Sequence, residues 1–293
     1  MLAFMVAWAP LVRSQVSVEI EMDQKFFLPH EALVVKVRVT NFSGQTLSLG
    51  DKANWLSFHV EGQSNRFVAS MEPVPVTGDY SLDSSKVGVK PVDLAPYFDL
   101  TMPDHYTVTA IVNIPQWNLE MKSKPAEFDI VSGTKLWSQD FGVPLLPDAA
   151  ASVPEVRQYM LLQTIHQRQL MLYFQVSNPS ESKVLRVFPV GPMVSFSKPE
   201  PQIDQYSNIH LLYQTGARRF TYSMINPDGL LISRETYDYS NTRPRLQAAE
   251  NGRISVTGGQ RRITSDDLPP PTKLEIFNED PRVPITDNTA PPK

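Results

Sequence analysis

The chain has 293 residues, with 27 Lys and Arg against 31 Asp and Glu, no cysteine and 41% hydrophobic residues, and is long enough for about two soluble globular domains. The net charge of -4 excludes a general affinity for nucleic acid or for an anionic membrane. The lack of cysteine excludes disulfide frameworks, thiolate zinc sites and cysteine nucleophiles.

The first segment, residues 1–14, is apolar as far as Val12 and ends with Arg13 and Ser14. Such a run is too short to cross a bilayer, but it has the length of the hydrophobic region of a secretory signal. We therefore expect a signal peptide over 1–14 and an exported protein, which is periplasmic, on the cell surface or extracellular. The alternative is a buried first strand. No later run is apolar for long enough to be a membrane helix, so we expect no membrane span.

From Gln15 to about residue 132, apolar and polar residues alternate with a period of two. The clearest examples are Val16–Met22, Val35–Thr40 and Tyr106–Val112. This alternation is typical of strands that have one face on a core and the other in water. Because short strands are separated by turn residues, we predict an antiparallel β-sandwich over 15–132.

Two segments of this region resemble immunoglobulin-like (Ig-like) modules of secreted bacterial proteins. Leu100–Tyr106 is similar to a tyrosine corner, in which the Tyr hydroxyl bonds to backbone a few residues upstream. Glu31–Gly44 is similar to the B-strand region of such modules. The resemblance implies an Ig-like sandwich and no activity.

Prolines punctuate the sequence between Val143 and Glu155, so we predict a linker over 133–155. The following region, 156–263, contains a repeat: Gly216-Ala-Arg-Arg-Phe-Thr221 recurs as Gly259-Gln-Arg-Arg-Ile-Thr264, an offset of about 43 residues. Equivalent units predict a positive φ for both glycines and a buried position for both Phe220 and Ile263. Over Val156–Ile165 the pattern leaves strand and helix open.

An offset of this size lies within the ~40–45 residue period of a four-stranded propeller blade. The segment from Pro201 to Tyr213 resembles the opening strands of blades in sialidase-like propellers, although the Asp-box is absent. Two or three blades cannot close a ring of four to eight. We therefore expect a small β-sandwich or an incomplete propeller-like fold over 156–263, followed by a proline-rich disordered tail over 264–293.

The motif search finds no phosphate cradle, dinucleotide fingerprint, zincin helix or nucleophile elbow, and the histidines lack metal-ligand spacing. We predict no cofactor and no metal site. His210, with Asp204 and Glu200, is the best acid–base candidate. The alternative is an exposed strand position, because the repeat places Arg253 and Gln247 where the first copy has His210 and Asp204.

Arginine is concentrated between residues 217 and 263, where lysine is absent and tyrosines are interleaved. Guanidinium forks and amphipathic rings suit carboxylates, sulfates and sugars. The competing interpretation is that each arginine faces solvent while the aromatic residues form the core, since Arg219 and Phe220 point to opposite sides of a strand. The candidate binding residues are Arg218, Arg219, Arg261, Arg262, Tyr222 and His210.

These observations predict an all-β, exported bacterial protein without catalytic activity, which acts as a binding or structural component of the cell envelope or extracellular space. Its expected partner is a polysaccharide or an envelope protein, and neither nucleic acid nor a membrane span is expected. The alternative is a carbohydrate-active enzyme, or an accessory subunit of one, that binds an acidic glycan through its arginine-rich β domain.

Overall fold

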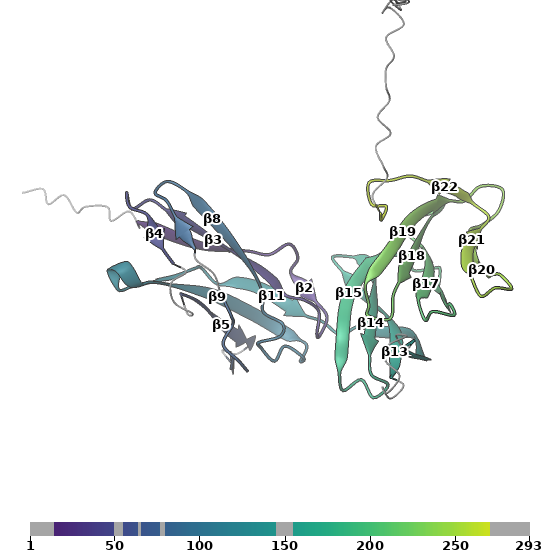
Figure 1. Cartoon of the computed structure of the whole chain (residues 1–293), viewed down its shortest axis with the longest axis horizontal. Helices are drawn as coiled ribbons and strands as arrows, with labels where there is room; N and C mark the ends of the chain where they lie inside the picture. Colours follow the sequence, from purple (N-terminus) through teal and green to yellow (C-terminus); the bar gives the residue numbers. More distant parts are fainter. Residues whose placement is uncertain (1–14, 50–54, 64–65, 77–79, 145–154, 270–293) are drawn as a thin grey trace, which may run out of the picture.

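The computed structural model describes residues 15–49, 55–63, 66–76, 80–144 and 155–269. The chain is all-β, as predicted, and every strand pairing is antiparallel except that of β2 with β11 (Figure 1). The predicted signal peptide (1–14), the proline-rich part of the predicted linker (145–154) and most of the predicted tail (270–293) lie outside these residues. No helix within the ranges given above is long and apolar enough to cross a membrane.

The N-terminal half contains two main sheets. The first has the order β1 (Val16–Glu21), β3 (Val34–Asn41) and β8 (Val87–Asp93). The second has the order β2 (Phe26–Phe27), β11 (Ala126–Ile130), β9 (Asp104–Ile114), β5 (Leu56–Gly62) and β6 (Arg66–Val68), with β10 (Leu119–Lys122) also paired to β9. Strands β4 (Leu47–Ser48) and β7 (Ser81–Leu82) form a small ladder, and a 3-10 turn, η2 (Pro115–Trp117), follows β9.

The period of two in the sequence explains how these sheets pack. Val35, Val37 and Val39 of β3 are fully buried, and they share one core with Val108 and Ala110 of β9. The polar residues between them face outward.

The hydrogen bond predicted for the tyrosine corner is present. The Tyr106 hydroxyl donates to the carbonyl oxygen of Met102 at 2.9 Å, and the Tyr106 ring is fully buried.

The C-terminal half begins with a four-stranded meander of β12 (Thr134–Gly142), β13 (Val156–His166), β14 (Gln169–Ser177) and β15 (Val184–Pro192). A five-stranded sheet follows in the order β16 (Glu200–Ile203), β17 (Ile209–Gln214), β18 (Arg219–Ile225), β19 (Leu231–Asp238) and β22 (Gln260–Arg262). Strands β20 (Arg245–Ala248) and β21 (Ile254–Thr257) form a separate hairpin. The segment for which the sequence leaves strand and helix open is strand β13.

Both faces of the five-stranded sheet are covered in part. Tyr159, Phe174 and Leu211 belong to the core between this sheet and the β12–β15 meander. On the opposite face, Phe220 and Leu246 belong to a smaller core beneath the β20–β21 hairpin. The sheet is therefore the central layer of the C-terminal half.

Two predicted boundaries need correction. Strand β12 lies inside the predicted linker, where it pairs with β13 over the whole length from Thr134 to Gly142. The segment Lys135-Leu-Trp-Ser-Gln139 lacks strict alternation, because the ladder is irregular between Lys135 and Trp137. The predicted tail is also structured at its start: Leu268 forms a bridge with Arg234, and Asp267 is 6% exposed.

The repeat expectation is wrong in its details. Gly259 has a φ of 64°, but Gly216 does not have a positive φ, and Ile263 is 71% exposed whereas Phe220 is 3% exposed. The physical reason is topological. Gly216 lies in the hairpin turn between the paired strands β17 and β18, whereas Gly259 lies where the chain leaves the β20–β21 hairpin to join β19 through β22.

What does recur is a turn that begins at Asp204, Asn226 and Ala249. In each turn the first residue bonds through its N–H to the carbonyl four residues on, and the fourth residue bonds back to it. That fourth residue has a positive φ, namely 62° at Ser207 and 74° at both Gly229 and Gly252. Chain reversals at three places in the C-terminal half therefore use one backbone geometry.

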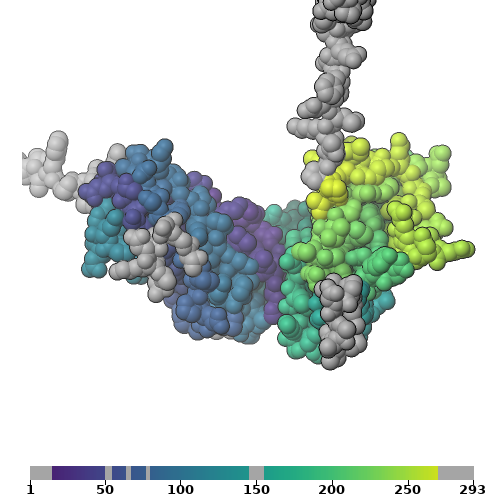
Figure 2. Space-filling view, viewed as in Figure 1, coloured from purple at the N-terminus to yellow at the C-terminus, as the bar shows by residue number. Residues whose placement is uncertain are grey.

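The two halves meet beside β2, and Figure 2 shows them as two lobes in contact along one side. Leu28 is 1% exposed and packs in a cluster with Met160, Leu162 and Tyr173. Glu31 lies next to this contact and is 5% exposed. Burial raises the pKa of Glu31 to about 7, although its carboxylate accepts hydrogen bonds from the Leu28 N–H and from Gln24.

The glycine turns provide a first prediction. Gly229→Ala is expected to destabilise the protein more than Gly252→Ala, although both residues have a φ of 74°. The Cβ of an alanine at 229 would lie 2.8 Å from Val176 and 3.2 Å from Arg186, whereas at 252 its nearest neighbour is Gln205 at 3.4 Å. Backbone strain alone costs ~1–2 kcal/mol. Urea denaturation of both variants measures the difference, and equal losses would contradict the packing at Gly229.

Burial of Phe220 and exposure of Ile263 give a second prediction. Phe220→Ala is expected to lower the free energy of unfolding by ~3–5 kcal/mol because it leaves a cavity in the core beneath the hairpin. Ile263→Ala is expected to cost under ~1 kcal/mol. Chemical denaturation of the two variants tests this, and similar costs at both positions would restore the equivalence that the repeat predicts.

Glu31 gives a third prediction, on pH. Its pKa in the folded chain is about 7, above the ordinary value of 4.5, so between these values the folded state holds a proton that the unfolded state has released. Stability should therefore fall as the pH rises through this window, by on the order of 1–3 kcal/mol. Glu31→Gln should flatten this fall between about pH 5 and pH 8. The exposed control Glu72→Gln should retain it, and an unchanged slope in Glu31→Gln would refute the assignment.

Candidate functional site

The register of the five-stranded sheet divides its side chains between two faces. Arg219 pairs with Asp238, and Thr221 pairs with Thr236, so these four side chains share one face. Tyr222 pairs with Glu235 on the other face. The same rule continues into β22, where Arg262 pairs with Thr236 and Arg261 with Tyr237. Adjacent arginines in the sequence therefore belong to opposite faces.

The face that carries Arg219 borders a cavity of about 860 Å³ beside the end of β15. We call it the arginine cavity. Four guanidinium groups and two carboxylates line it, and its other walls combine threonines, tyrosines and Gln260 with small or apolar residues such as Val190. The charged residues are Arg218, Arg219, Arg234, Arg262, Asp238 and Asp266. The cavity is thus a positively charged site in a chain of net negative charge.

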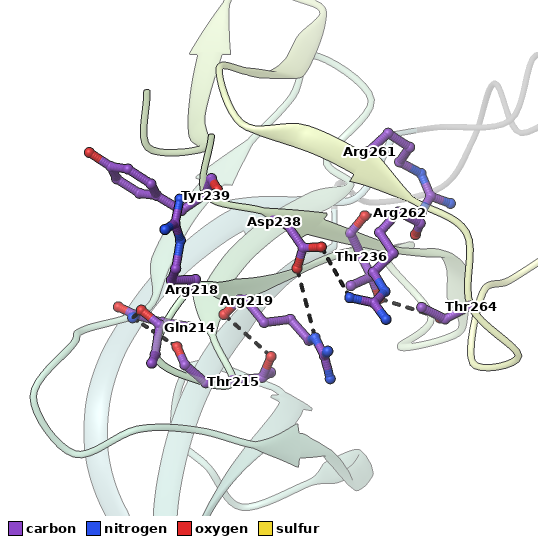
Figure 3. A network of polar contacts seen from close by, with 12 residues as sticks. Gln214, Thr215, Arg218, Arg219, Thr236, Asp238, Tyr239, Arg261, Arg262 and Thr264 are labelled. Atoms are coloured by element: carbon purple, nitrogen blue, oxygen red, sulfur yellow. Dashed lines mark hydrogen bonds and ion pairs between the residues drawn. The ribbon is translucent and has the colours of Figure 1, made fainter. Parts of the chain in front are cut away.

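Three of the arginines predicted from the sequence lie at the rim of this cavity (Figure 3). Asp238 lies between two of them, 3.9 Å from the Arg219 Nε and 3.2 Å from an Arg262 terminal nitrogen. Arg218 donates to the carbonyl oxygen of Tyr239 at 3.1 Å, and its guanidinium lies 5.4 Å from the centre of that ring. One carboxylate thus orients two exposed guanidinium groups, each of which retains free donors.

Arg234, in the middle of β19, is the least satisfied cation of the cavity. One terminal nitrogen donates to the carbonyl oxygen of Val190 at 3.1 Å. Its Nε is buried and has no hydrogen-bond partner, and within the part of the chain that the structure describes no carboxylate lies at ion-pair distance from it. Burial raises the pKa of the neighbouring Tyr213 to about 12, and the charge of Arg234 opposes this rise.

Arg261, the fourth predicted arginine, does not join the other three. Figure 3 shows its side chain directed away from Arg219. It forms ion pairs with Glu235 at 3.4 Å and with the buried Asp267 at 2.7 Å, and its guanidinium lies over the Tyr237 ring. Its role is to anchor the start of the C-terminal segment. Arg261, a candidate binding residue from the sequence, therefore lies on the opposite face of the sheet and does not line the arginine cavity.

His210 and Tyr222 also lie on the opposite face. The His210 Nδ1 is 2.8 Å from the Tyr222 hydroxyl, and its Nε2 is 3.2 Å from an Asp204 carboxylate oxygen. The predicted pairing of His210 with Asp204 is present, but Glu200 is not part of it, since its carboxylate pairs with Arg243 at 3.3 Å. His210 is 4% exposed, so the alternative of an exposed strand position is wrong.

Sequence reasoning missed Arg234, Asp238 and Tyr213 as lining residues. The available signal was the alternation Arg234, Thr236, Asp238 along one strand, which places a polar row on one face. Without the pairing of β19 to β18, this row could not be matched to Arg219. No group of three or more potential metal ligands occurs among the residues described above.

Comparison with known proteins gives no family. No family model matches the chain, and no curated protein matches its sequence. Among solved structures, the crystal structure of Spo0M, a sporulation control protein from Bacillus subtilis, matches with 10% sequence identity and a TM-score of 0.31. The match covers 59% of this chain and 83% of that chain.

Proposed function

We propose that this chain is a non-catalytic, exported binding protein of a bacterial cell envelope or extracellular space, and that its arginine cavity binds an acidic glycan. The ligand is a saccharide that carries carboxylate or sulfate groups. The proposal includes the predicted signal peptide over 1–14. It also includes two fold-level resemblances predicted from the sequence. The N-terminal half resembles an Ig-like module, and the C-terminal meanders resemble propeller blades.

The observation that carries this proposal is the unsatisfied guanidinium of Arg234. A buried donor without a partner costs about 1–3 kcal/mol, and more when the group is charged. A carboxylate or sulfate in the cavity would accept from the two terminal nitrogens of Arg234 together, in a two-point geometry that arginine favours. A bound anion would offset the free-energy cost of burying the Arg234 charge.

The rim favours an extended ligand over a small inorganic ion. Arg218, Arg219 and Arg262 present exposed guanidinium groups around the cavity, and Tyr239 offers a ring that is 41% exposed. A volume of about 860 Å³ exceeds the need of a single sulfate and lies within the usual range of ligand sites. Successive acidic groups of an oligosaccharide would reach the floor and the rim at once.

The alternative, a carbohydrate-active enzyme, requires a carboxylic acid with a raised pKa next to a second carboxylate. The pKa of Asp267 is shifted in the opposite direction. Burial raises its pKa, but hydrogen bonds from Arg261 and Thr264 outweigh this effect and hold the pKa below the usual range. A carboxyl group that stays ionised cannot donate a proton to a leaving group, so Asp267, which lies outside the lining of the arginine cavity, is not a general acid for such a reaction.

The test is calorimetric titration of the protein with oligogalacturonate and with a sulfated oligosaccharide at low ionic strength. We expect binding of at least one of them, and affinity should fall as salt is added because exposed ion pairs are screened. Arg234→Gln should weaken binding by about tenfold or more through loss of the two-point contact. Arg262→Ala at the rim should have a smaller effect.

Arg245→Gln is the matched control, because Arg245 is an exposed arginine on β20 and does not line the cavity. It removes the same charge and should leave the affinity within about twofold. If the wild type binds neither probe, or if Arg245→Gln weakens binding as much as Arg234→Gln, the proposal is wrong.

A further inference from the structure

A second cavity, of about 530 Å³, lies on the other face of the five-stranded sheet. It opens between two of the recurrent turns, the one at Asp204 and the one that ends at Arg253. The cross-strand neighbours Tyr222 and Glu235 contribute to its floor. We call it the hairpin cavity. It shares no lining residue with the arginine cavity.

Its floor is a chain of fixed polar groups. Asp204 accepts hydrogen bonds from the backbone N–H groups of Tyr206 and Asn208 at 2.9 and 2.8 Å. These bonds, with those from the Asn208 and His210 side chains, hold the pKa of Asp204 below its usual range despite the opposing effect of burial. An ionised Asp204 only accepts, so the His210 Nε2 donates to it; in the tautomer with Nδ1 unprotonated, Nδ1 accepts from the Tyr222 hydroxyl.

This network is not arranged for nucleophilic catalysis. Burial raises the pKa of Tyr222 to about 12, and the negative charges of Glu235 and Asp204 add to this effect. The phenol therefore stays protonated at neutral pH. In the tautomer in which His210 Nδ1 accepts, the Tyr222 proton is directed to it, and the lone pairs of the phenol oxygen remain as acceptors for a bound hydroxyl group.

The charges of the hairpin cavity are opposite to those of the arginine cavity. Two carboxylates and one guanidinium line it: Asp204, Glu235 and Arg253. Glu235 accepts from the Tyr237 hydroxyl at 2.6 Å and pairs with Arg261, so both carboxylates already have partners. They would repel an anion, and Arg253 disfavours a cation. What remains is a set of acceptors suited to neutral hydroxyl groups.

An exposed aromatic ring stands at the edge of this cavity. Tyr206 lines it and is 64% exposed. Its backbone is fixed by the bond to Asp204, so the ring is presented by a rigid turn. A ring with an apolar face and a polar tip suits the mixed surface of a pyranose.

We propose that the hairpin cavity is a second binding site, and that it takes a neutral pyranose unit. The sugar hydroxyls donate to the Tyr222 oxygen and to the two carboxylates, Arg253 donates to a ring or hydroxyl oxygen, and Tyr206 packs against the apolar face. The chain then has two sites of different charge preference on the two faces of one sheet.

The test uses a panel of neutral hexasaccharides, namely cellohexaose, maltohexaose, mannohexaose and chitohexaose, titrated against the intact protein. We expect at least one to bind with a Kd on the order of 1 mM or tighter. Tyr206→Ala should weaken that binding by about tenfold. The control Tyr239→Ala removes another exposed tyrosine, from the rim of the other cavity, and should leave neutral-sugar affinity unchanged, as should Arg234→Gln.

Two results would overturn this proposal. One is the absence of binding by every hexasaccharide at about 10 mM. The other is binding that survives Tyr206→Ala, or that is lost with Tyr239→Ala instead. Both are independent of the acidic-glycan test, because Arg234→Gln and Tyr206→Ala should each affect one ligand class alone. Thermal denaturation of each variant verifies that it is folded.

Discussion

The pairing of β18 with β19 is the constraint on which the functional surfaces depend. Ser223 pairs with Arg234, and Tyr222 pairs with Glu235. Because side chains alternate along both strands, a shift of one residue in this register would exchange the contents of the two faces. The register gathers guanidinium groups on the face beside β15 and a carboxylate–imidazole–phenol network on the face beneath the β20–β21 hairpin. The β17–β18 pairing extends the division, since Tyr213 faces Thr221 and Leu212 faces Tyr222.

Arg234 lies where the packing that covers one face of the sheet ends. The core with the β12–β15 meander covers most of one face, and the arginine cavity begins where this core ends at Tyr213 and Val190. Arg234 lies at this limit, where its Nε is out of contact with water but its terminal nitrogens reach Val190 and the cavity. An aliphatic residue there would avoid the desolvation cost. The charge of Arg234 is what connects the fold to the proposed function.

Local periodicity made the strands and their buried faces predictable, and long-range pairing limited the rest. The alternation around Val35–Val39 and the opposition of Arg219 and Phe220 followed from a period of two. The same rule, applied to Arg261 and Arg262, separates them, but only the pairing with β19 shows which one faces the cavity. The repeat led to a wrong prediction because the identical residues Gly216 and Gly259 lie in different connections between strands. The recurrent turn is instead marked by a positive φ, which Ser207 and Gly252 both adopt, and residue identity alone does not reveal it.

A crystal structure of the protein with a bound oligogalacturonate tests the central claim most directly. The account predicts a carboxylate of the ligand against Arg234, with an oxygen about 2.7–2.9 Å from one of its terminal nitrogens and further acidic groups at the rim formed by Arg218 and Arg262. A ligand held only by exposed arginines outside the cavity would contradict it, as would an Arg234 whose Nε is already paired with a carboxylate of the chain itself.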